Sequence, residues 1–351
     1  MSTAQQDEPD RLEGFPHPRE ASALFGHQGA QAAMLDGLKG GRLHHAWLIG
    51  GPEGIGKATF AYRMAKHLLG VHCGAAGADG MPFVDEAAPA SRLVAQLAHP
   101  DLVVLRRQLQ PRTGTISTQI TVDHARRALD MFASTAGQGG WRVCIVDSAD
   151  DLNSSSGNAL LKVIEEPPPR AIFLIVAHQP GRVLPTIRSR CRKLMLRPLA
   201  EGEVLDALRL IEPSADAAAM KQAASLSDGA VRRALLRLDP DTAALILATR
   251  AELDKLPRFA LDGVMKIANQ IAGKRGEAES AIFMETLEDW VSQHMHGNIA
   301  AGAHRLAPLA EVWEKTSRSV RETEAFNLDR RALVLSIFHD LADAVSRLRA
   351  A

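Results

Sequence analysis

Apolar and polar positions along the chain follow two different periods. Near-continuous apolar runs of strand length lie at residues 44–50, 101–107, 141–147, 171–177 and 192–199. Between these runs, apolar residues recur at helical spacing, for example in residues 60–70 and 122–135. Strands that are apolar throughout and alternate with helices indicate a parallel sheet covered on both faces. The pattern therefore predicts an α/β domain over residues 23–198.

The chain changes character on either side of this domain. Residues 1–22 are polar, contain three prolines and lack periodicity, so we expect a disordered arm there. Residues 71–99, inside the domain, are rich in Ala, Gly and Pro and predict a loop or a small irregular insertion. No strand candidate follows Pro198. We expect short helices over residues 199–239 and longer ones over 240–351, which gives an α/β fold followed by an all-α region.

Composition narrows the class of protein. Hydrophobic residues make up 46% of the chain and charged residues 23%, which are ordinary globular values. No run approaches the roughly 18 apolar residues of a membrane span, and the polar, acidic N-terminus is unlike a secretory signal. The three cysteines, at positions 73, 144 and 191, are far apart and odd in number, which fits neither a disulfide framework nor a CxxC metal pair. We therefore expect a cytoplasmic protein without membrane contact.

The charge balance bears on nucleic-acid binding. The 41 Lys and Arg residues equal the 41 Asp and Glu residues, whereas a dedicated DNA-binding protein usually carries a basic excess. Aromatic residues, at 4%, are too few for a platform on which single-stranded bases stack. A stand-alone nucleic-acid-binding protein is therefore the weakest of the function classes that we consider.

A phosphate-binding loop is the clearest chemical motif. The segment GPEGIGKAT, residues 51–59, follows an apolar strand and opens a helix. Its glycines would let backbone amides turn inward around a phosphate, and the helix N-terminus would add positive potential. These glycines are Gly51, Gly54 and Gly56. Lys57 would reach the outer phosphates, so the segment predicts a nucleotide site or its remnant.

This motif lacks two groups that ATP hydrolysis ordinarily needs. Ala58 stands where a Ser or Thr would hold Mg²⁺, and Thr59 lies about 100° farther around the helix. Asp147 ends an apolar strand, as the Mg²⁺-orienting carboxylate of such sites does, but Ser148 follows it in place of a general base. We expect no metal and no required cofactor, with ATP bound, if at all, without hydrolysis.

Three further segments contribute to the pattern. Residues 158–169, NALLKVIEEPPP, form an amphipathic helix that the prolines stop. Residues 185–191, PTIRSRC, are a short cationic segment before the last strand, and residues 229–235, GAVRRAL, begin a helix with two arginines. Taken alone, Arg190 in the second segment would most often be a solvated surface charge.

Together these segments, in this order and spacing, resemble the AAA+ clamp-loader family. The matching stretches are residues 44–59, 99–105, 146–169, 185–191 and 229–235. The resemblance implies an AAA+ domain at 23–198, a helical lid at 199–239 and a helical collar at 240–351. It also implies a complex of five subunits that uses ATP to open the sliding clamp and place it on primed DNA during replication.

Within that family, the degenerate loop is similar to that of the non-hydrolysing stator subunit, which has neither ATPase turnover nor a polymerase site of its own. The resemblance assigns Arg190 as an arginine finger that enters the ATP site of a neighbouring motor subunit. Arg232 matches the lid arginine that senses nucleotide in active relatives. Many relatives carry a zinc module with four cysteines, but residues 71–99 hold only Cys73, so no zinc is expected.

One alternative from another function class stays open. The chain could be an active ATPase if Thr59 replaced the missing Mg²⁺ ligand and Asp150 or Asp151 replaced the missing base. Both carboxylates lie beyond the strand end, where a turn or capping role is more usual.

Overall fold

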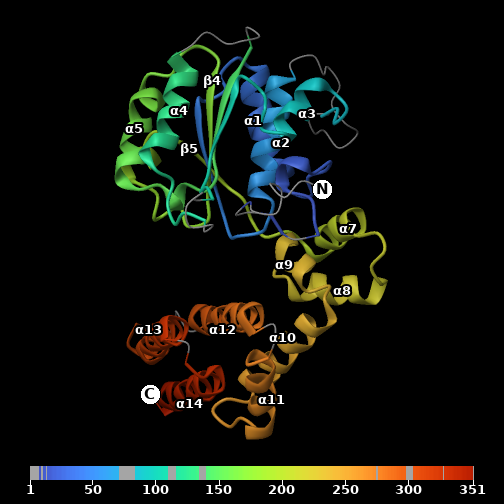
Figure 1. Cartoon of the computed structure of the whole chain (residues 1–351), viewed down its shortest axis with the longest axis vertical. Helices are drawn as coiled ribbons and strands as arrows, with labels where there is room; N and C mark the ends of the chain where they lie inside the picture. The colour runs from blue at the N-terminus through green and yellow to red at the C-terminus, as the bar shows by residue number, and fades with distance from the viewer. Residues whose placement is uncertain are drawn as a thin grey trace. The chain divides into compact units, whose positions relative to one another are not determined.

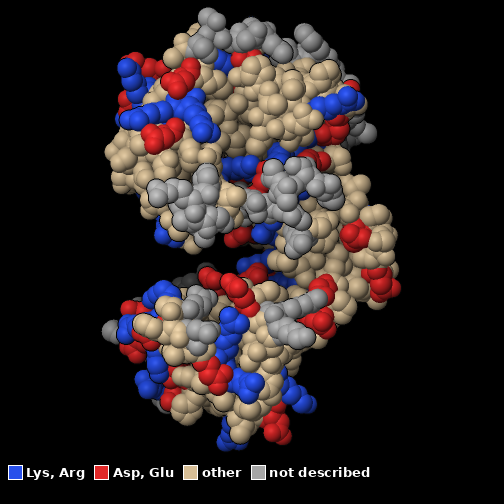
Figure 2. Space-filling view, in the orientation of Figure 1, with Lys and Arg blue, Asp and Glu red and all other residues tan. Residues whose placement is uncertain are grey.

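The computed structural model describes residues 8, 11–12, 14–70, 84–109, 116–133, 140–273, 276–297, 303–326 and 328–350. It divides into two compact units, Met1–Leu235 and Leu236–Ala351 (Figure 1). Acidic and basic side chains are interspersed on the face seen in Figure 2, in keeping with the zero net charge. Within the described residues, no helix is both long enough and apolar enough to cross a membrane.

A five-stranded parallel sheet forms the centre of the first unit. Its strands are β1 (Ala46–Gly50), β2 (Leu102–Leu105), β3 (Arg142–Val146), β4 (Ala171–Ala177) and β5 (Arg192–Met195). They are ordered β2-β3-β4-β1-β5, and every pairing is parallel. This arrangement confirms the α/β prediction and places β5, with its exposed Arg192 and Lys193, at one edge.

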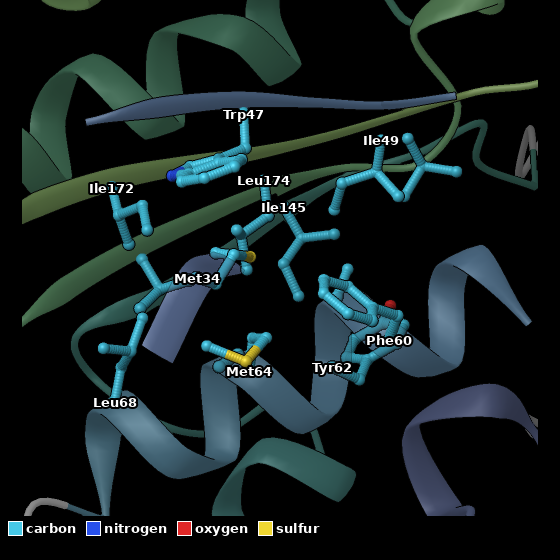
Figure 3. Packing of buried hydrophobic residues seen from close by; sticks show 14 of the residues in the cluster. Met34, Trp47, Ile49, Phe60, Tyr62, Met64, Leu68, Ile145, Ile172 and Leu174 are labelled. Carbon is cyan, nitrogen blue, oxygen red and sulfur yellow. The ribbon is translucent and has the colours of Figure 1, made fainter. Parts of the chain in front are cut away.

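Helices cover both faces of this sheet (Figure 1). One face carries α1 (Gln28–Lys39), α2 (Lys57–Leu69) and α3 (Pro89–Ala95); the other carries α4 (Val122–Ala133) and α5 (Ser154–Glu165). Because side chains alternate along a strand, Trp47 and Ile49 of β1 enter the first core and Leu48 enters the second. Figure 3 shows Trp47 and Ile49 facing Phe60 and Met64 of α2. Each such burial stabilises the fold by roughly 1.5–3 kcal/mol.

Two segments expected to be irregular contain helix. Residues 18–20 form a short 3₁₀ helix, η2 (Pro18–Glu20), and His17 and Arg19 are buried beside it, so a disordered arm was wrong for this stretch. Their burial against α2 and α3 outweighs the polar composition that suggested disorder. Helix α3 lies within the stretch expected to be a loop. Cys73 lies outside the described residues.

Among the described residues after the sheet, the regular elements are all helices. The short α6 (Pro185–Arg188) precedes β5, and three helices come after it: α7 (Glu201–Ile211), α8 (Ala217–Leu226) and α9 (Val231–Leu236). The second unit consists of α10 (Pro240–Leu253), α11 (Leu261–Ile271), α12 (Gly276–Gly297), α13 (Ala303–Phe326) and α14 (Arg330–Ala350). These helices enclose a separate apolar core that includes Phe283 and Phe338. The all-α character expected after the sheet is thus confirmed.

Candidate functional site

The glycine-rich segment is a tight loop between the carboxyl end of β1 and the start of α2. Gly51, Gly54 and Gly56 have φ angles of +147°, +78° and +97°, in the region that favours glycine. A Cβ on Gly51 would lie 2.6 Å from the carbonyl oxygen of Leu196, and one on Gly54 would lie 3.0 Å from Cβ of Arg232. The loop therefore needs these glycines both for its backbone angles and for its close neighbours.

Lys57 is the first residue of α2 and its side chain is buried inside the loop. Its Nζ donates to the carbonyl oxygen of Pro52 at 2.5 Å. Burial lowers the pKa of Lys57 to about 8, although the nearby carboxylates of Glu53, Asp147 and Asp150 act in the opposite direction. At neutral pH the charged form of Lys57 is thus only weakly favoured over the neutral amine. An anion beside it would stabilise the charged form.

A cavity of about 630 Å³ opens above this loop. Six of the residues that the sequence predicted for a nucleotide site line this cavity. They come from the loop, α2, the end of β3 and α9: Gly54, Gly56, Lys57, Thr59, Asp147 and Arg232. Arg232 donates its backbone N–H to the carbonyl oxygen of Gly54 at 3.3 Å, and its Nε lies 3.9 Å from Oε1 of Glu53. Of the predicted site residues, all within the described part of the chain, Gly51 and Arg190 lie outside the cavity wall.

The carboxylates at the end of β3 are engaged in different ways. Asp150 accepts backbone N–H groups of His178 at 2.6 Å and Gln179 at 2.8 Å, and the Ser148 hydroxyl at 3.1 Å. Burial alone would raise the pKa of Asp150, but these hydrogen bonds outweigh it and the pKa is lowered. Asp151 pairs with Arg107 at 3.2 Å. Asp150 therefore joins the ends of β3 and β4 and is not poised as a base.

The residues present fit a phosphate group better than they fit a metal ion. Left-handed glycines, a helix N-terminus and Lys57 form the kind of cradle that a polyphosphate requires. Asp147 would supply one oxygen to Mg²⁺, but Ala58 supplies none where the second protein ligand is ordinarily found. In the described residues, no group of three His, Cys, Asp or Glu side chains is placed to hold a metal.

Sequence reasoning missed part of the cavity wall. Leu12, Phe15 and Pro16, from the segment expected to be disordered, line it on one side. His27 also contacts the loop, because its Nε2 lies 2.7 Å from the carbonyl oxygen of Ile55. The apolar residues within the polar N-terminal segment were the available indication that it packs against the domain.

Arg190 lies at the opposite end of the sheet from the loop. It precedes β5, whose first residue, Arg192, is in register with Trp47 near the start of β1, whereas the glycine loop follows the end of β1. Nη2 of Arg190 contacts Oε1 of Glu165 at 2.5 Å, and the side chain is 38% exposed. In the first unit, the glycine loop therefore lies at the carboxyl ends of the strands and Arg190 lies at their amino ends.

Comparison with known proteins places the chain in a family. The profile of a family described as "DNA polymerase III, delta subunit" matches residues 27–200. DNA polymerase III subunit delta' of Yersinia pestis is 31% identical over 283 residues, which cover 77% of each chain. The chain belongs to the DNA polymerase III delta' subunit family. This membership confirms the resemblance seen in the sequence motifs.

Other proteins named as DNA polymerase III subunits or as related to them are also similar to the chain. The delta' subunit of Pseudomonas aeruginosa is 35% identical over 200 residues, or 57% of each chain, so the match spans little more than half of that relative. DNA polymerase III subunit tau of Escherichia coli is 27% identical over 274 residues, 76% of this chain and 40% of that one. A gamma subunit-related protein of Thermotoga maritima superposes with a TM-score of 0.44 at 14% identity, covering 90% of this chain and 99% of that one.

Proposed function

We propose that this delta' family member is the non-hydrolysing subunit, or stator, of a clamp loader. In this role it assembles with motor ATPase subunits and a delta subunit into a complex of five, which loads the sliding clamp on primed DNA. It supplies Arg190 to the ATP site of a neighbouring subunit. Its own glycine loop is vestigial or holds a nucleotide without turnover.

The position of Arg190 carries this proposal. The guanidinium is partly exposed and lies at the amino ends of the strands, away from the chain's own glycine loop. An arginine that neutralises charge on a transferring phosphoryl group must come from a partner if it cannot reach its own site. Ala58 after Lys57 and Ser148 after Asp147 add support, because both remove groups that hydrolysis in this chain would need.

The test is a clamp loader reconstituted from purified subunits, with ATP hydrolysis followed in the presence of clamp and primed DNA. Loss of an arginine finger costs about 10³-fold or more in rate at the affected site. We expect Arg190→Ala to slow that site by this amount, while Lys57→Ala leaves turnover near the wild-type rate. Arg209→Ala is the matched control, since Arg209 is exposed and pairs with Asp206 on its own helix. Unchanged hydrolysis with Arg190→Ala would overturn the finger assignment.

One observation favours the alternative, an active ATPase. Thr59 lines the cavity together with Lys57 and Asp147, although it is one residue later than a Mg²⁺ ligand is ordinarily found. The alternative predicts ATP turnover by the isolated chain, abolished by both Lys57→Ala and Thr59→Val. We expect the isolated chain to turn over no ATP above a control without protein.

A further inference from the structure

Arg190 is held within its own chain by groups at two helix ends. Its Nη2 contacts Oε1 of Glu165, the last residue of α5, at 2.5 Å. Its Nη1 donates to the carbonyl oxygen of Thr186, in α6, at 2.9 Å. The two charged side chains remain partly exposed, 38% for Arg190 and 44% for Glu165. The guanidinium is therefore restrained in direction while it stays within reach of another molecule.

The end of α5 explains why a cation is held there. The carboxyl end of a helix carries partial negative charge, so a carboxylate at its last residue is unfavourable unless a cation lies beside it. Arg190 supplies that cation. The ring of His45, which precedes β1 and stacks on His44 with centroids 4.4 Å apart, hydrogen-bonds to the backbone of Ile164 at the same helix end. Glu165 is the one carboxylate with which Arg190 forms an ion pair among the described residues.

The contacts leave part of the guanidinium available. A guanidinium carries five N–H groups in a fixed planar fork. Within the described residues, Nη1 of Arg190 donates hydrogen bonds to Thr186 and Ser189, and Nη2 forms an ion pair with Glu165. None of these contacts with described residues engages Nε–H, which is left for an anion outside the chain. Binding Glu165 and binding a phosphate oxygen are thus compatible.

We propose that Glu165 is a positioning residue that holds Arg190 in the direction from which it reaches the phosphates of the neighbouring subunit. This inference rests on the proposed function. A free arginine side chain is distributed over many rotamers, and it must be ordered when it meets the phosphate. The Glu165 carboxylate restricts that distribution before the subunits meet. The effect is on the rate of phosphoryl transfer at the neighbouring site and not on ATP binding there.

The experiment is single-turnover hydrolysis of labelled ATP by the reconstituted complex with clamp and primed DNA, in which the one affected site appears as a separate slow phase. A partly exposed ion pair restrains a side chain modestly, so we expect Glu165→Ala to slow that phase about fivefold. The ATP concentration at half-saturation should not change. Glu165→Gln, which keeps an oxygen acceptor, should recover part of the rate. Glu166→Ala is the control, because Glu166 is the adjacent exposed glutamate.

A double-mutant comparison separates positioning from a merely structural role. If Glu165 acts through Arg190, adding Glu165→Ala to Arg190→Ala slows the phase no further. Further slowing in that background, or a wild-type rate with Glu165→Ala alone, would overturn the inference while leaving Arg190 as the finger. If Arg190→Ala itself has no effect, the proposed function fails first. The two failures are therefore distinguishable in one set of complexes.

Discussion

Arg232 of α9 and Gly54 of the glycine loop are joined by a backbone hydrogen bond of 3.3 Å, and the Cβ of Arg232 lies 3.0 Å from where a Cβ on Gly54 would stand. The loop that follows β1 is thus joined by a hydrogen bond to the helices that follow β5. This contact is backbone to backbone, so it does not depend on the charge of Arg232. A methyl group on Gly54 would therefore crowd Arg232, which lines the same cavity.

Gly54→Ala should destabilise the first unit. Its Cβ would lie 3.0 Å from Cβ of Arg232, and the φ angle of +78° is strained for alanine. We expect the free energy of unfolding to fall by about 1–3 kcal/mol, measured by urea denaturation. Gly29→Ala is the matched control, because a Cβ there meets nothing within 4 Å and the site is helical. Equal stabilities of the two variants would contradict this account.

Lys57→Met should stabilise the protein at neutral pH. Burial lowers the pKa of Lys57 from the ordinary 10.5 to about 8. The folded state therefore binds this proton less tightly than the unfolded chain does, and the charged lysine destabilises the fold. Removing the charge should raise the free energy of unfolding by up to about 3 kcal/mol at pH 7.

The advantage of Lys57→Met should shrink as pH rises from 8 to 10.5, because the folded wild type loses its proton over this range while the unfolded chain still holds one. Urea denaturation at pH 7, 9 and 10.5 would measure it. Lys221→Met, at an exposed lysine, should show no such trend. A difference between Lys57→Met and wild type that stays constant with pH would show that burial of the charge is not its cause.

Glu8→Gln should loosen the N-terminal segment. Glu8 pairs with Arg19 at 2.8 Å and with Arg106 at 2.7 Å, which ties the segment to the residue that follows β2. Burial alone would raise the pKa of Glu8, but these hydrogen bonds outweigh it and lower the pKa to about 2. We expect a loss of about 1–2 kcal/mol at pH 7 and faster tryptic cleavage after Arg19.

The pH dependence of Glu8→Gln has the opposite sign to that of Lys57→Met. The folded state of the wild type binds this proton less readily than the unfolded chain, so the contribution of Glu8 is complete above pH 4.5 and is lost as pH falls toward 2. Thermal unfolding at pH 7 and pH 3 should therefore show a large and a small difference from wild type, respectively. Glu166→Gln, at an exposed glutamate, should match wild type at both.

Asp150→Asn and Asp151→Asn make the same chemical change at neighbouring positions and should differ. Asp150 accepts two backbone N–H groups and a hydroxyl, so an amide places its own NH₂ against a donor. We expect a loss of about 1–3 kcal/mol for Asp150→Asn. Asp151→Asn removes a partly exposed ion pair with Arg107 and should cost less than about 1 kcal/mol. Equal losses in urea denaturation would contradict the bridging role of Asp150.

The sheet and its coverage could be predicted from the sequence because near-continuous apolar runs such as residues 171–177 suit a strand buried on both faces, and all seven residues of β4 are buried. The glycine loop was equally predictable, since its function requires residues that tolerate left-handed backbone angles. Local pattern was sufficient for both, because each depends on residues that are neighbours in sequence.

The features that the sequence did not predict depend on contacts between residues far apart in the chain. The burial of His17 and Arg19 arises from packing against α2 and α3 and from the hydrogen bond of Arg19 to Ala95, which no local pattern encodes. The meeting of Arg232 with Gly54, and of Glu165 with Arg190, likewise joins segments far apart in the chain. The family resemblance could assign a role to Arg190, but it gave no indication of the glutamate beside it.

The glycine loop and Arg190 lie at opposite ends of the strands of one parallel sheet. If Arg190 of one molecule enters the glycine loop of a second, Arg190 of the second molecule points away from the first. The two molecules therefore cannot exchange arginines in a symmetric contact. The resulting contact is head-to-tail and gives a row of subunits its polarity. A row of this kind has one end that offers an arginine and another that offers a loop. We therefore expect the proposed stator, with Ala58 after Lys57 and Ser148 after Asp147, at the end whose loop receives no arginine.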